Sequence, residues 1–305
     1  MSANEGSAHS IRAGVIGLGI MGGAFAKHLA AAADVRTSGY DLLAANLEAF
    51  SACGGRACSS ARAVAAEADF VITSLPHSAA LESALFGSEG VVAAGRSGLL
   101  VVETSTLPLE DKERMRGRLA SVGIGMLDAP ISGTGPQAQA KDITIFGSGD
   151  REEFDRARNI LSNFARSVRY VGPFGAGSKM KYIANLLVAI HIVGAAEAIV
   201  LGEKAGLDPS LLVEVLADSA ATSRMLEVRG PSMATGAYAT PMMKVDVFQK
   251  DLNIIADFAK QAKCPVPLFS ASVPLFTAVA AQGMGLHDTA AVISVLRFLA
   301  GLEEK

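Results

Sequence analysis

A glycine-rich segment near the N-terminus has the residue types and spacing that bind a dinucleotide. Its sequence is Gly17-Leu18-Gly19-Ile20-Met21-Gly22, and it directly follows a short apolar run. Such glycines allow a tight strand-to-helix turn and let a pyrophosphate approach the backbone at a helix N-terminus. Asp41 lies 19 residues after Gly22, where its carboxylate could accept hydrogen bonds from a ribose. The alternative is that the glycines only form a turn and Asp41 only caps a helix.

Asp41 also indicates which dinucleotide is bound. Its negative charge would repel the 2′-phosphate of NADP, because like charges at close range disfavour each other. The next residues, Leu42 and Leu43, include no arginine that could neutralise that phosphate. The sequence therefore favours NAD over NADP as the cofactor.

Lys181 and Asn185 could act on one small ligand. They are four residues apart in a segment with helical periodicity, so both side chains would lie on the same helix face. Lys179 would point about 200° away from Lys181. Desolvation and an oxidised nicotinamide would disfavour the charged form of Lys181, which could then take the proton of a substrate hydroxyl as hydride leaves. The alternative for Lys181 is a solvated helix lysine. The alternative for Asn185 is a side-chain amide bonded to a neighbouring turn of the helix.

Ser132 and Gly133 follow the end of another apolar run, where open α/β sheets present ligands. A serine hydroxyl beside exposed backbone N–H groups can hold a carboxylate, although a simple turn serine is the alternative. His77, His191 and His287 share no metal-ligand spacing, and no HExxH motif is present, so we expect no metal.

The composition is that of a protein with a large core. The chain has 305 residues, 50% hydrophobic and 19% charged, which predicts two domains or one large one. A net charge of -3 argues against a nucleic-acid partner. The apolar run 182–201 contains Asn185, His191 and Glu197, which favours a buried helix over a membrane span. Three cysteines without a CxxC pair indicate a reducing cytoplasm.

The order of the expected elements predicts an α/β fold with a doubly wound parallel sheet. The polar residues 1–10 lack an apolar core and are interpreted as a flexible tail. Residues 11–173 would form the sheet domain, and 174–305 an all-helical domain that begins with a long helix. The expected strands are 12–16, 35–40, 70–74, 99–103, 125–129, 143–147 and 167–171, and the expected helices include 20–33, 43–50, 60–67, 108–121 and 151–163.

Four ordered segments, spread over nearly the whole chain, together match one enzyme family. They are 17–23 with Ala26 and Leu29, 128–133, 175–185 and 250–252. On these segments the sequence resembles the β-hydroxyacid dehydrogenase family, whose members join a Rossmann domain to an all-helical domain. Segment 223–231, with the downstream 250–252, looks closest to the branch that contains L-threonate dehydrogenase-like enzymes.

The resemblance implies a role for each matching residue. It implies that Lys181 is the general acid/base, that Asn185 orients the substrate hydroxyl and that Ser132 binds the substrate carboxylate. It also implies that a set of residues beyond strand ends and in the helical domain lines the cofactor, namely Leu75, Pro76, Thr106 and Lys250. For Lys250 an ion pair with Asp251 or another acid is the alternative.

The sequence departs from the family pattern at several positions. Thr134 stands where glycine is common, and Gln137 and Lys141 replace two further glycines. Thr134 could add a hydroxyl to the substrate pocket or only stiffen its loop. Ala80 stands where relatives often have an asparagine that contacts the cofactor. The change at Thr134 bears on the size and polarity of the substrate, and the change at Ala80 implies that the cofactor contact is absent or replaced.

The expected function is therefore an NAD(P)-dependent dehydrogenase of a small 3-hydroxy acid. The alternatives are an imine reductase-like enzyme, which usually lacks a lysine at position 181, and a non-catalytic nucleotide-sensing protein on the same fold. Arg224 and Arg229 could serve a substrate anion, but arginines at helix ends more often face solvent. We expect a cytoplasmic homodimer or homotetramer without a membrane partner, because the long helices can bury further faces against a second subunit.

Overall fold

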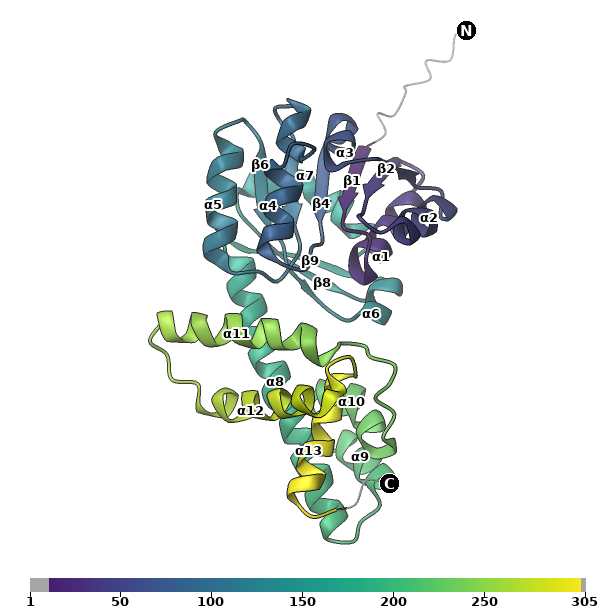
Figure 1. Cartoon of the computed structure of the whole chain (residues 1–305), viewed down its shortest axis with the longest axis vertical. Helices are drawn as coiled ribbons and strands as arrows, with labels where there is room; N and C mark the ends of the chain where they lie inside the picture. The colour runs from purple at the N-terminus through teal and green to yellow at the C-terminus, as the bar shows by residue number, and fades with distance from the viewer. Residues whose placement is uncertain (1–10, 303–305) are drawn as a thin grey trace. The chain divides into compact units, whose positions relative to one another are not determined.

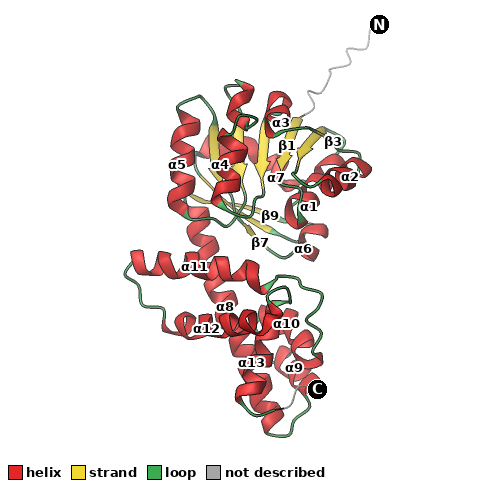
Figure 2. Cartoon of the chain, in the orientation of Figure 1, coloured by secondary structure: helices red, strands yellow, loops and turns green. Residues whose placement is uncertain are grey.

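The computed structural model of the protein describes residues 11–302, and the predicted tail 1–10 lies outside the described residues. The chain divides into two compact units, the first ending at Lys181 and the second beginning at Tyr182. Figure 2 shows the strands in the first unit, whereas the second consists of helices and loops. This arrangement confirms the predicted fold class, a Rossmann-type sheet domain followed by a helical domain.

One nine-stranded sheet organises the first unit (Figure 1). Its strands lie in the order β3-β2-β1-β4-β5-β6-β8-β7, and β9 pairs with β8. The order reverses between β1 and β4, and open α/β sheets bind ligands outside the carboxyl ends of the strands at such a reversal. The strands are β1 Ile11–Ile16, β2 Val35–Tyr40, β3 Arg56–Ala57, β4 Phe70–Thr73, β5 Leu100–Glu103, β6 Gly125–Asp128, β7 Ile131–Ser132, β8 Thr144–Ser148 and β9 Ser167–Gly172.

The sheet is mixed where the sequence predicts a parallel one. Strand β8 runs antiparallel to β6 and β7, and parallel to β9. Between β6 and β8 the chain forms only β7 and the five-residue helix α6 (Gly135–Gln139). That connection is too short for the crossover that a parallel strand would need. The predicted doubly wound core, β1 to β6, is parallel throughout.

Helices cover both faces of this sheet. Successive strand residues point to opposite faces, so Ile72 and Val102 belong to one apolar cluster and Val71 and Val101 to another. Helices α1 and α7 pack in the first cluster, and α3, α4 and α5 in the second. The helices are α1 Ile20–Ala30, α2 Ala44–Ala52, α3 Ala61–Glu67, α4 Ser78–Phe86, η1 Val91–Ala94, α5 Leu109–Ala120 and α7 Arg151–Ser162.

The second unit is built around the long helix α8 (Figure 1). Ala189, Ile192, Ala196 and Ile199 recur every three or four residues along it and are fully buried, as expected for one helix face. Residues of the later helices complete this apolar core. The helices are α8 Ala176–Lys204, α9 Pro209–Ala217, α10 Arg224–Thr235, α11 Val245–Gln261, α12 Pro267–Val279, η2 Ala280–Met284, η3 Thr289–Ala291 and α13 Val292–Leu299.

Helix α8 is, within residues 11–302, the one helix long and apolar enough to cross a membrane by length and composition alone. In the structure, 44% of its most apolar 18-residue window is buried. A core helix meets the same criterion, and the buried face of α8 lies in the apolar core of the second unit. The buried face thus has a structural explanation that does not involve a membrane.

Candidate active site

The three glycines of the first loop have different surroundings. Gly17 has φ +88°, and a Cβ there would overlap Ser74 O. A Cβ at Gly22 would overlap Gly17 O, so the start of α1 packs directly on the loop. At Gly19 a Cβ would have no heavy atom within 4 Å, and the residue is exposed. Two glycines are therefore required by packing, whereas the third leaves open space beside the backbone.

That open space lies at the N-terminus of α1. Gly19 is the N-cap residue, and no side chain caps the helix or places an acid in its first turn. The first N–H groups of a helix lack partners within it and carry partial positive charge. Ile20 and Met21, the first residues of α1, are exposed and partly buried respectively. The loop thus suits the pyrophosphate of a dinucleotide.

Asp41 lies beside this loop, as the spacing predicts. Its Oδ2 accepts a hydrogen bond from Leu18 N at 2.6 Å, and its Oδ1 accepts one from Leu43 N at 2.8 Å. Each carboxylate oxygen can accept a further bond, so both backbone contacts are compatible with a ribose hydroxyl. Leu42 and Leu43 are exposed, and neither carries positive charge. These residues fit NAD better than a 2′-phosphate.

Two more predicted cofactor segments lie next to each other. Leu75 and Pro76 follow β4, and Thr106 follows β5. Ser105 Oγ accepts a hydrogen bond from Leu75 N at 2.8 Å, which joins the two loops. Pro76 is exposed, while Leu75 and Thr106 are partly buried. Ala80 lies in the first turn of α4, where its N–H donates to His77 Nδ1 at 3.1 Å.

The predicted substrate loop is held by its own side chains. Ser132 ends β7, and Gly133 has φ +148°, where a Cβ would meet Ile143 Cγ2 at 2.5 Å. Gln137 Oε1 accepts hydrogen bonds from Thr134 N at 2.9 Å and from Thr134 Oγ1 at 3.1 Å. In this structure the Thr134 hydroxyl therefore serves to stiffen the loop.

Lys141, which replaces another glycine of the family pattern, adopts a left-handed conformation with φ +58°. It lies just after α6, where its N–H donates to Ala138 O at 3.2 Å. A residue with a Cβ is strained in this region, whereas glycine is not. Lys141 thus adopts a backbone conformation that glycine would adopt with less strain.

Lys181 and Asn185 lie on α8 with the predicted spacing. Lys181 is partly buried and Lys179 is exposed. Asn185 is buried, and its Nδ2 donates a hydrogen bond to Asp251 Oδ2 at 2.8 Å. Lys250 Nζ lies 3.4 Å from Asp251 Oδ1, so the ion pair considered as the alternative for this lysine is present. Asp251 thereby brings Asn185 and Lys250 together within the second unit.

The sequence reasoning missed a buried polar cluster at the carboxyl ends of three strands. Thr73, Glu103 and Asp128 are register neighbours on β4, β5 and β6. Thr73 Oγ1 donates to Glu103 Oε2, and Glu103 Oε1 accepts from Ser105 N at 2.7 Å. Lys112 Nζ donates to Asp128 Oδ1 at 2.9 Å and lies 3.8 Å from Glu103 Oε1.

Asp128 also contacts the first turn of α8. Its Oδ2 accepts from Ser178 N at 2.7 Å, and its Oδ1 accepts from Ser178 Oγ at 2.7 Å. Ser148 Oγ donates to Asp128 O and accepts from Gly177 N, both at 2.9 Å. The helix that carries Lys181 therefore starts bonded to the carboxyl ends of β6 and β8. The helical period of α5, in which Lys112, Met115 and Leu119 are the buried residues, was the signal that could have revealed Lys112.

Arg224 and Arg229 were both expected to face solvent, and only Arg224 does so. Arg224 is exposed, and its Nη1 donates to Glu227 Oε2 at 2.9 Å. Arg229 is only 1% exposed, and its Nε lies 3.4 Å from Asp288 Oδ1. Burial lowers the pKa of Arg229, and the charge of Asp288 opposes that shift. Arg229 does not face solvent because it lies on the buried face of α10, with Leu226 and Met233.

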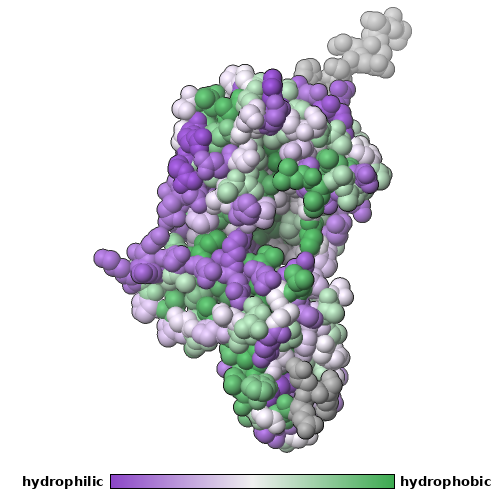
Figure 3. All heavy atoms as spheres, viewed as in Figure 1, coloured by the Kyte–Doolittle hydropathy of each residue, from purple (hydrophilic) through white to green (hydrophobic). Residues whose placement is uncertain are grey.

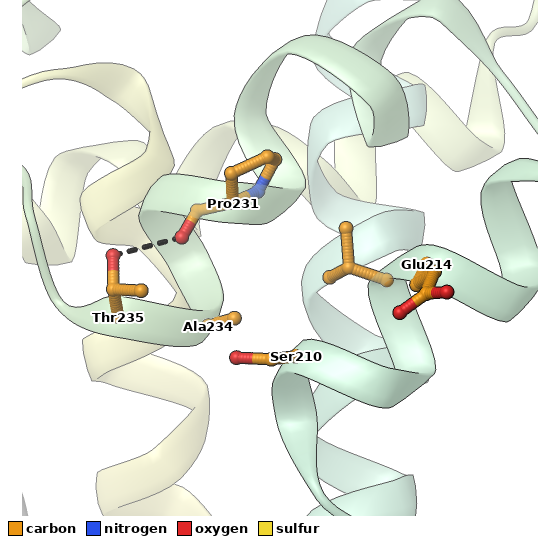
Figure 4. Close-up of a pocket in the computed structure, with 6 residues that line it drawn as sticks. Ser210, Glu214, Pro231, Ala234 and Thr235 are labelled. Carbon is orange, nitrogen blue, oxygen red and sulfur yellow. Dashed lines mark hydrogen bonds between the residues drawn. The ribbon is translucent and has the colours of Figure 1, made fainter.

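A pocket on the second unit lies between α9 and α10 (Figure 4). The Thr235 hydroxyl donates to Pro231 O at 2.8 Å beside it. None of the predicted site residues belongs to its lining, which consists of Ser210, Val213, Glu214, Pro231, Ala234 and Thr235. Across the described part of the chain, no group of three or more His, Cys, Asp or Glu residues could hold a metal ion.

Comparison with known proteins gives matches over almost the whole chain. Residues 12–172 match the family model for the NAD binding domain of 6-phosphogluconate dehydrogenase. Residues 175–296 match the model for the NAD-binding region of NADP-dependent 3-hydroxyisobutyrate dehydrogenase. The two models together account for both units and indicate one enzyme family.

Individual proteins agree with the family models. L-threonate dehydrogenase of Cupriavidus necator is 38% identical over 92% of this chain and 95% of its own. 2-(Hydroxymethyl)glutarate dehydrogenase of Eubacterium barkeri is 32% identical over 96% of this chain and 97% of its own. The crystal structure of a 3-hydroxyisobutyrate dehydrogenase from Salmonella typhimurium has a TM-score of 0.85 and 33% identity, covering 93% of this chain and 99% of its own. All three similar proteins are dehydrogenases by name.

Proposed function

Because the chain belongs to the β-hydroxyacid dehydrogenase family, we propose that it oxidises the hydroxyl-bearing carbon of a small 3-hydroxy or polyhydroxy acid. It is an NAD(P)-dependent dehydrogenase that acts on CH–OH donors. The observation that carries the proposal is the joint presence of the dinucleotide loop and of Lys181 and Asn185 on one face of α8. L-Threonate is the first candidate substrate, because the Cupriavidus relative bears that name.

We propose that Lys181 is the general acid/base. In the oxidation its Nζ takes the proton of the substrate hydroxyl, and in the reduction it returns that proton. Asn185 orients the hydroxyl, with its amide held by Asp251. Ser132 and the backbone N–H of Gly133 hold the substrate carboxylate, and Thr134, whose own N–H is bonded to Gln137 Oε1, shapes the substrate loop beside them. When bound, NAD supplies the hydride acceptor.

We propose that Asp41 makes the enzyme prefer NAD. Its carboxylate lies 2.6 Å from Leu18 N, beside the glycine loop, and can accept further bonds from two ribose hydroxyls. A 2′-phosphate at that place would meet a negative charge. Gly17, Gly19 and Gly22 form the pyrophosphate loop, and Leu75, Pro76, Thr106 and Lys250 are proposed to line the rest of the cofactor.

We also propose that the enzyme is a cytoplasmic homodimer or homotetramer. Figure 3 shows apolar side chains, drawn green, at the surface of the helical unit. On α8 the exposed apolar residues Ile183, Leu187 and Leu201 are 51%, 46% and 73% exposed. Such a face can be buried against a second copy of the chain.

The test is the initial rate of reduced-nicotinamide formation by purified protein. The substrates are L-threonate, 3-hydroxyisobutyrate, D-glycerate and L-serine, each with NAD and NADP. Lys181→Ala should lower kcat by about 10²- to 10⁴-fold and leave NAD affinity unchanged, because general acid/base catalysis contributes about that much. Lys179→Ala, on the exposed side of the same helix, is the matched control.

Two outcomes would contradict the proposal. NAD binding without turnover of any of the four acids would favour the imine reductase-like or nucleotide-sensing alternative. Equal rates for Lys181→Ala and Lys179→Ala with an active wild type would remove Lys181 from the chemistry.

A further inference from the structure

A buried polar cluster in the first unit has no part in the proposed chemistry. We define the polar cluster as Thr73, Glu103, Lys112, Asp128, Ser148 and Ser178, all fully buried. Taking a charged group out of water costs several kcal/mol per ion even after relaxation. Apolar residues could attach α5 to the sheet without that cost. The positions of these groups therefore call for a reason beyond stability.

We propose that Asp128 and Lys112 are positioning residues, which hold the first turn of α8 and with it Lys181 in a fixed place relative to the cofactor and substrate loops. The inference rests on the proposed function of Lys181. The Asp128 carboxylate accepts hydrogen bonds from the backbone N–H and from the hydroxyl of Ser178, both at 2.7 Å. Lys181 follows Ser178 by three residues, which places it one turn further along the same side of the helix.

Helix α8 differs from its neighbours in how its first turn is held. Five other α-helices are capped by the side chain of the residue directly before them, namely Ser60, His77, Asp150, Asp208 and Ser223. The bonds to the first turn of α8 come instead from residues on β6 and β8, Asp128 and Ser148. A Cβ at Gly177 would overlap Phe146 O, so this turn also packs tightly on the sheet. Its position is set by the strands.

Lys112 extends the same set of bonds to the cofactor loops. Its Nζ donates to Ser105 O at 2.7 Å as well as to Asp128 Oδ1 at 2.9 Å. Ser105 Oγ in turn accepts from Leu75 N at 2.8 Å. One continuous run of hydrogen bonds thus connects the loops after β4 and β5 to the helix of Lys181. Asp128 also begins the segment that leads to Ser132, so the substrate loop starts from the same point.

Small displacements matter at such a place, because a shift of about 1 Å in a reacting group can cost about 100-fold in rate. The test is Ser178→Ala, which removes one bond to Asp128 and leaves the backbone bond. Its matched control is Ser272→Ala, a buried helical serine of the second unit whose Oγ donates to Leu268 O at 2.9 Å. Asp128→Asn and Lys112→Met are the stronger variants.

We expect Ser178→Ala to lower kcat by about 10-fold or more, with KM for the acid and the Kd for NAD nearly unchanged. With substrate deuterated at the hydroxyl-bearing carbon, the isotope effect on kcat should increase, because hydride transfer becomes slower relative to product release. Ser272→Ala should change neither quantity. A Ser178→Ala enzyme that only melts at lower temperature, with wild-type kcat and isotope effect, would overturn the proposal.

Amide hydrogen exchange in segment 176–185 separates this inference from the proposed function, because it needs no substrate. In Ser178→Ala and Asp128→Asn, exchange of this segment should become faster than in the wild type and in Ser272→Ala. Faster exchange with a wild type that oxidises none of the acids would refute the proposed function and leave the attachment of α8 intact. Unchanged exchange in an active enzyme would refute the positioning role alone.

Discussion

Asn185 Nδ2 donates a hydrogen bond to Asp251 Oδ2 across 2.8 Å, and both side chains are buried. The bond fixes which end of the amide is the donor, so Asn185 meets a ligand with a defined orientation. Lys250 lies on the other carboxylate oxygen, at 3.4 Å. One acidic residue therefore orients two residues of the proposed site.

Replacement of Asp251 should impair substrate binding. Asp251→Ala leaves the buried amide of Asn185 without this acceptor, a change that costs about 1–3 kcal/mol for a buried polar group. We expect KM for the acid to increase by about 10-fold, and NAD to bind more weakly as well, because Asp251 also holds the proposed cofactor residue Lys250. Steady-state kinetics and NAD titration measure this, with Asp257→Ala, an exposed acid on the same helix α11, as the control. Equal KM values for the two variants would contradict the role of Asp251.

The glycine loop predicts opposite outcomes for two alanine variants. Gly22→Ala should unfold at lower temperature, because its Cβ would overlap Gly17 O. Gly19→Ala has no heavy atom within 4 Å of its Cβ, so the melting temperature should stay near that of the wild type while NAD binds more weakly. Thermal melting and NAD titration of both variants decide this. Wild-type NAD affinity in Gly19→Ala would show that the pyrophosphate does not lie against this residue.

Asp41 should control the choice between NAD and NADP. Asp41→Ala removes the charge that repels a 2′-phosphate and the acceptor for the ribose hydroxyls, so NAD should bind about 10-fold more weakly or worse. The ratio of kcat/KM for NAD and NADP should fall accordingly. Asp34→Ala, which removes an exposed negative charge before β2, is the control. An unchanged ratio in Asp41→Ala would show that the ribose lies elsewhere.

Asp69 should contribute to stability in acid. The hydrogen bond from Arg12 is the main cause that lowers the pKa of Asp69 below its usual value of 3.8. Because the folded pKa is the lower one, this contribution is fully present above pH 3.8 and is lost as the pH falls toward the folded pKa. Arg12→Gln should therefore melt at a lower temperature near neutral pH, and its melting temperature should fall less steeply than that of the wild type below pH 3.8.

The control for the acid experiment is Arg36→Gln. Arg36 is the register partner of Arg12 on β2, so the variant removes the same charge from the adjacent strand. In Arg36→Gln the side chain of Arg12 is still present, so the 2.5 Å contact between Arg12 and Asp69 is kept. If the melting temperatures of Arg12→Gln and the wild type fell in parallel as the pH is lowered, the bond between Arg12 and Asp69 would not be a source of the pH dependence of stability.

Lys141→Gly should stabilise the protein. Lys141 has φ +58°, a conformation that costs a residue with a Cβ about 1 kcal/mol or more. Part of this gain is offset by the greater freedom of glycine in the unfolded chain. The neighbouring Ala140→Gly, at φ -88°, should be destabilising instead. Urea unfolding of both variants measures the difference, and a less stable Lys141→Gly protein would contradict the argument from backbone strain.

The sequence predicted the parallel core of the sheet because short apolar runs rich in strand-forming residues alternate with helical segments. It did not predict β3 and β7, which have two residues each and show no periodicity. The antiparallel direction of β8 also escaped prediction, because direction depends on the length of the connection and not on the composition of the strand. Local patterns thus predicted the elements better than their pairing.

The predicted site residues were found from motifs, whereas the contacts that support them were not. Asp41 and the glycine loop are close in space because they directly follow β2 and β1, two parallel neighbours in which Ile16 pairs with Tyr40. Lys112, in contrast, lies in a helix rich in charged residues, and its partner Asp128 lies 16 residues away on a strand. Asp251 is 66 residues from Asn185. Partners at such distances are set by tertiary packing, which spacing along the chain does not report.

The attachment of α8 to β6 has a consequence for dividing the chain. A fragment that ends at Gly172, close to the end of the first family model, would lack Gly177 and Ser178 and leave Asp128 buried with fewer donors. A fragment that continues through Lys181 would keep them and would match the compact unit seen in the structure. Recombination between members of this family should therefore place the junction after the first two turns of α8.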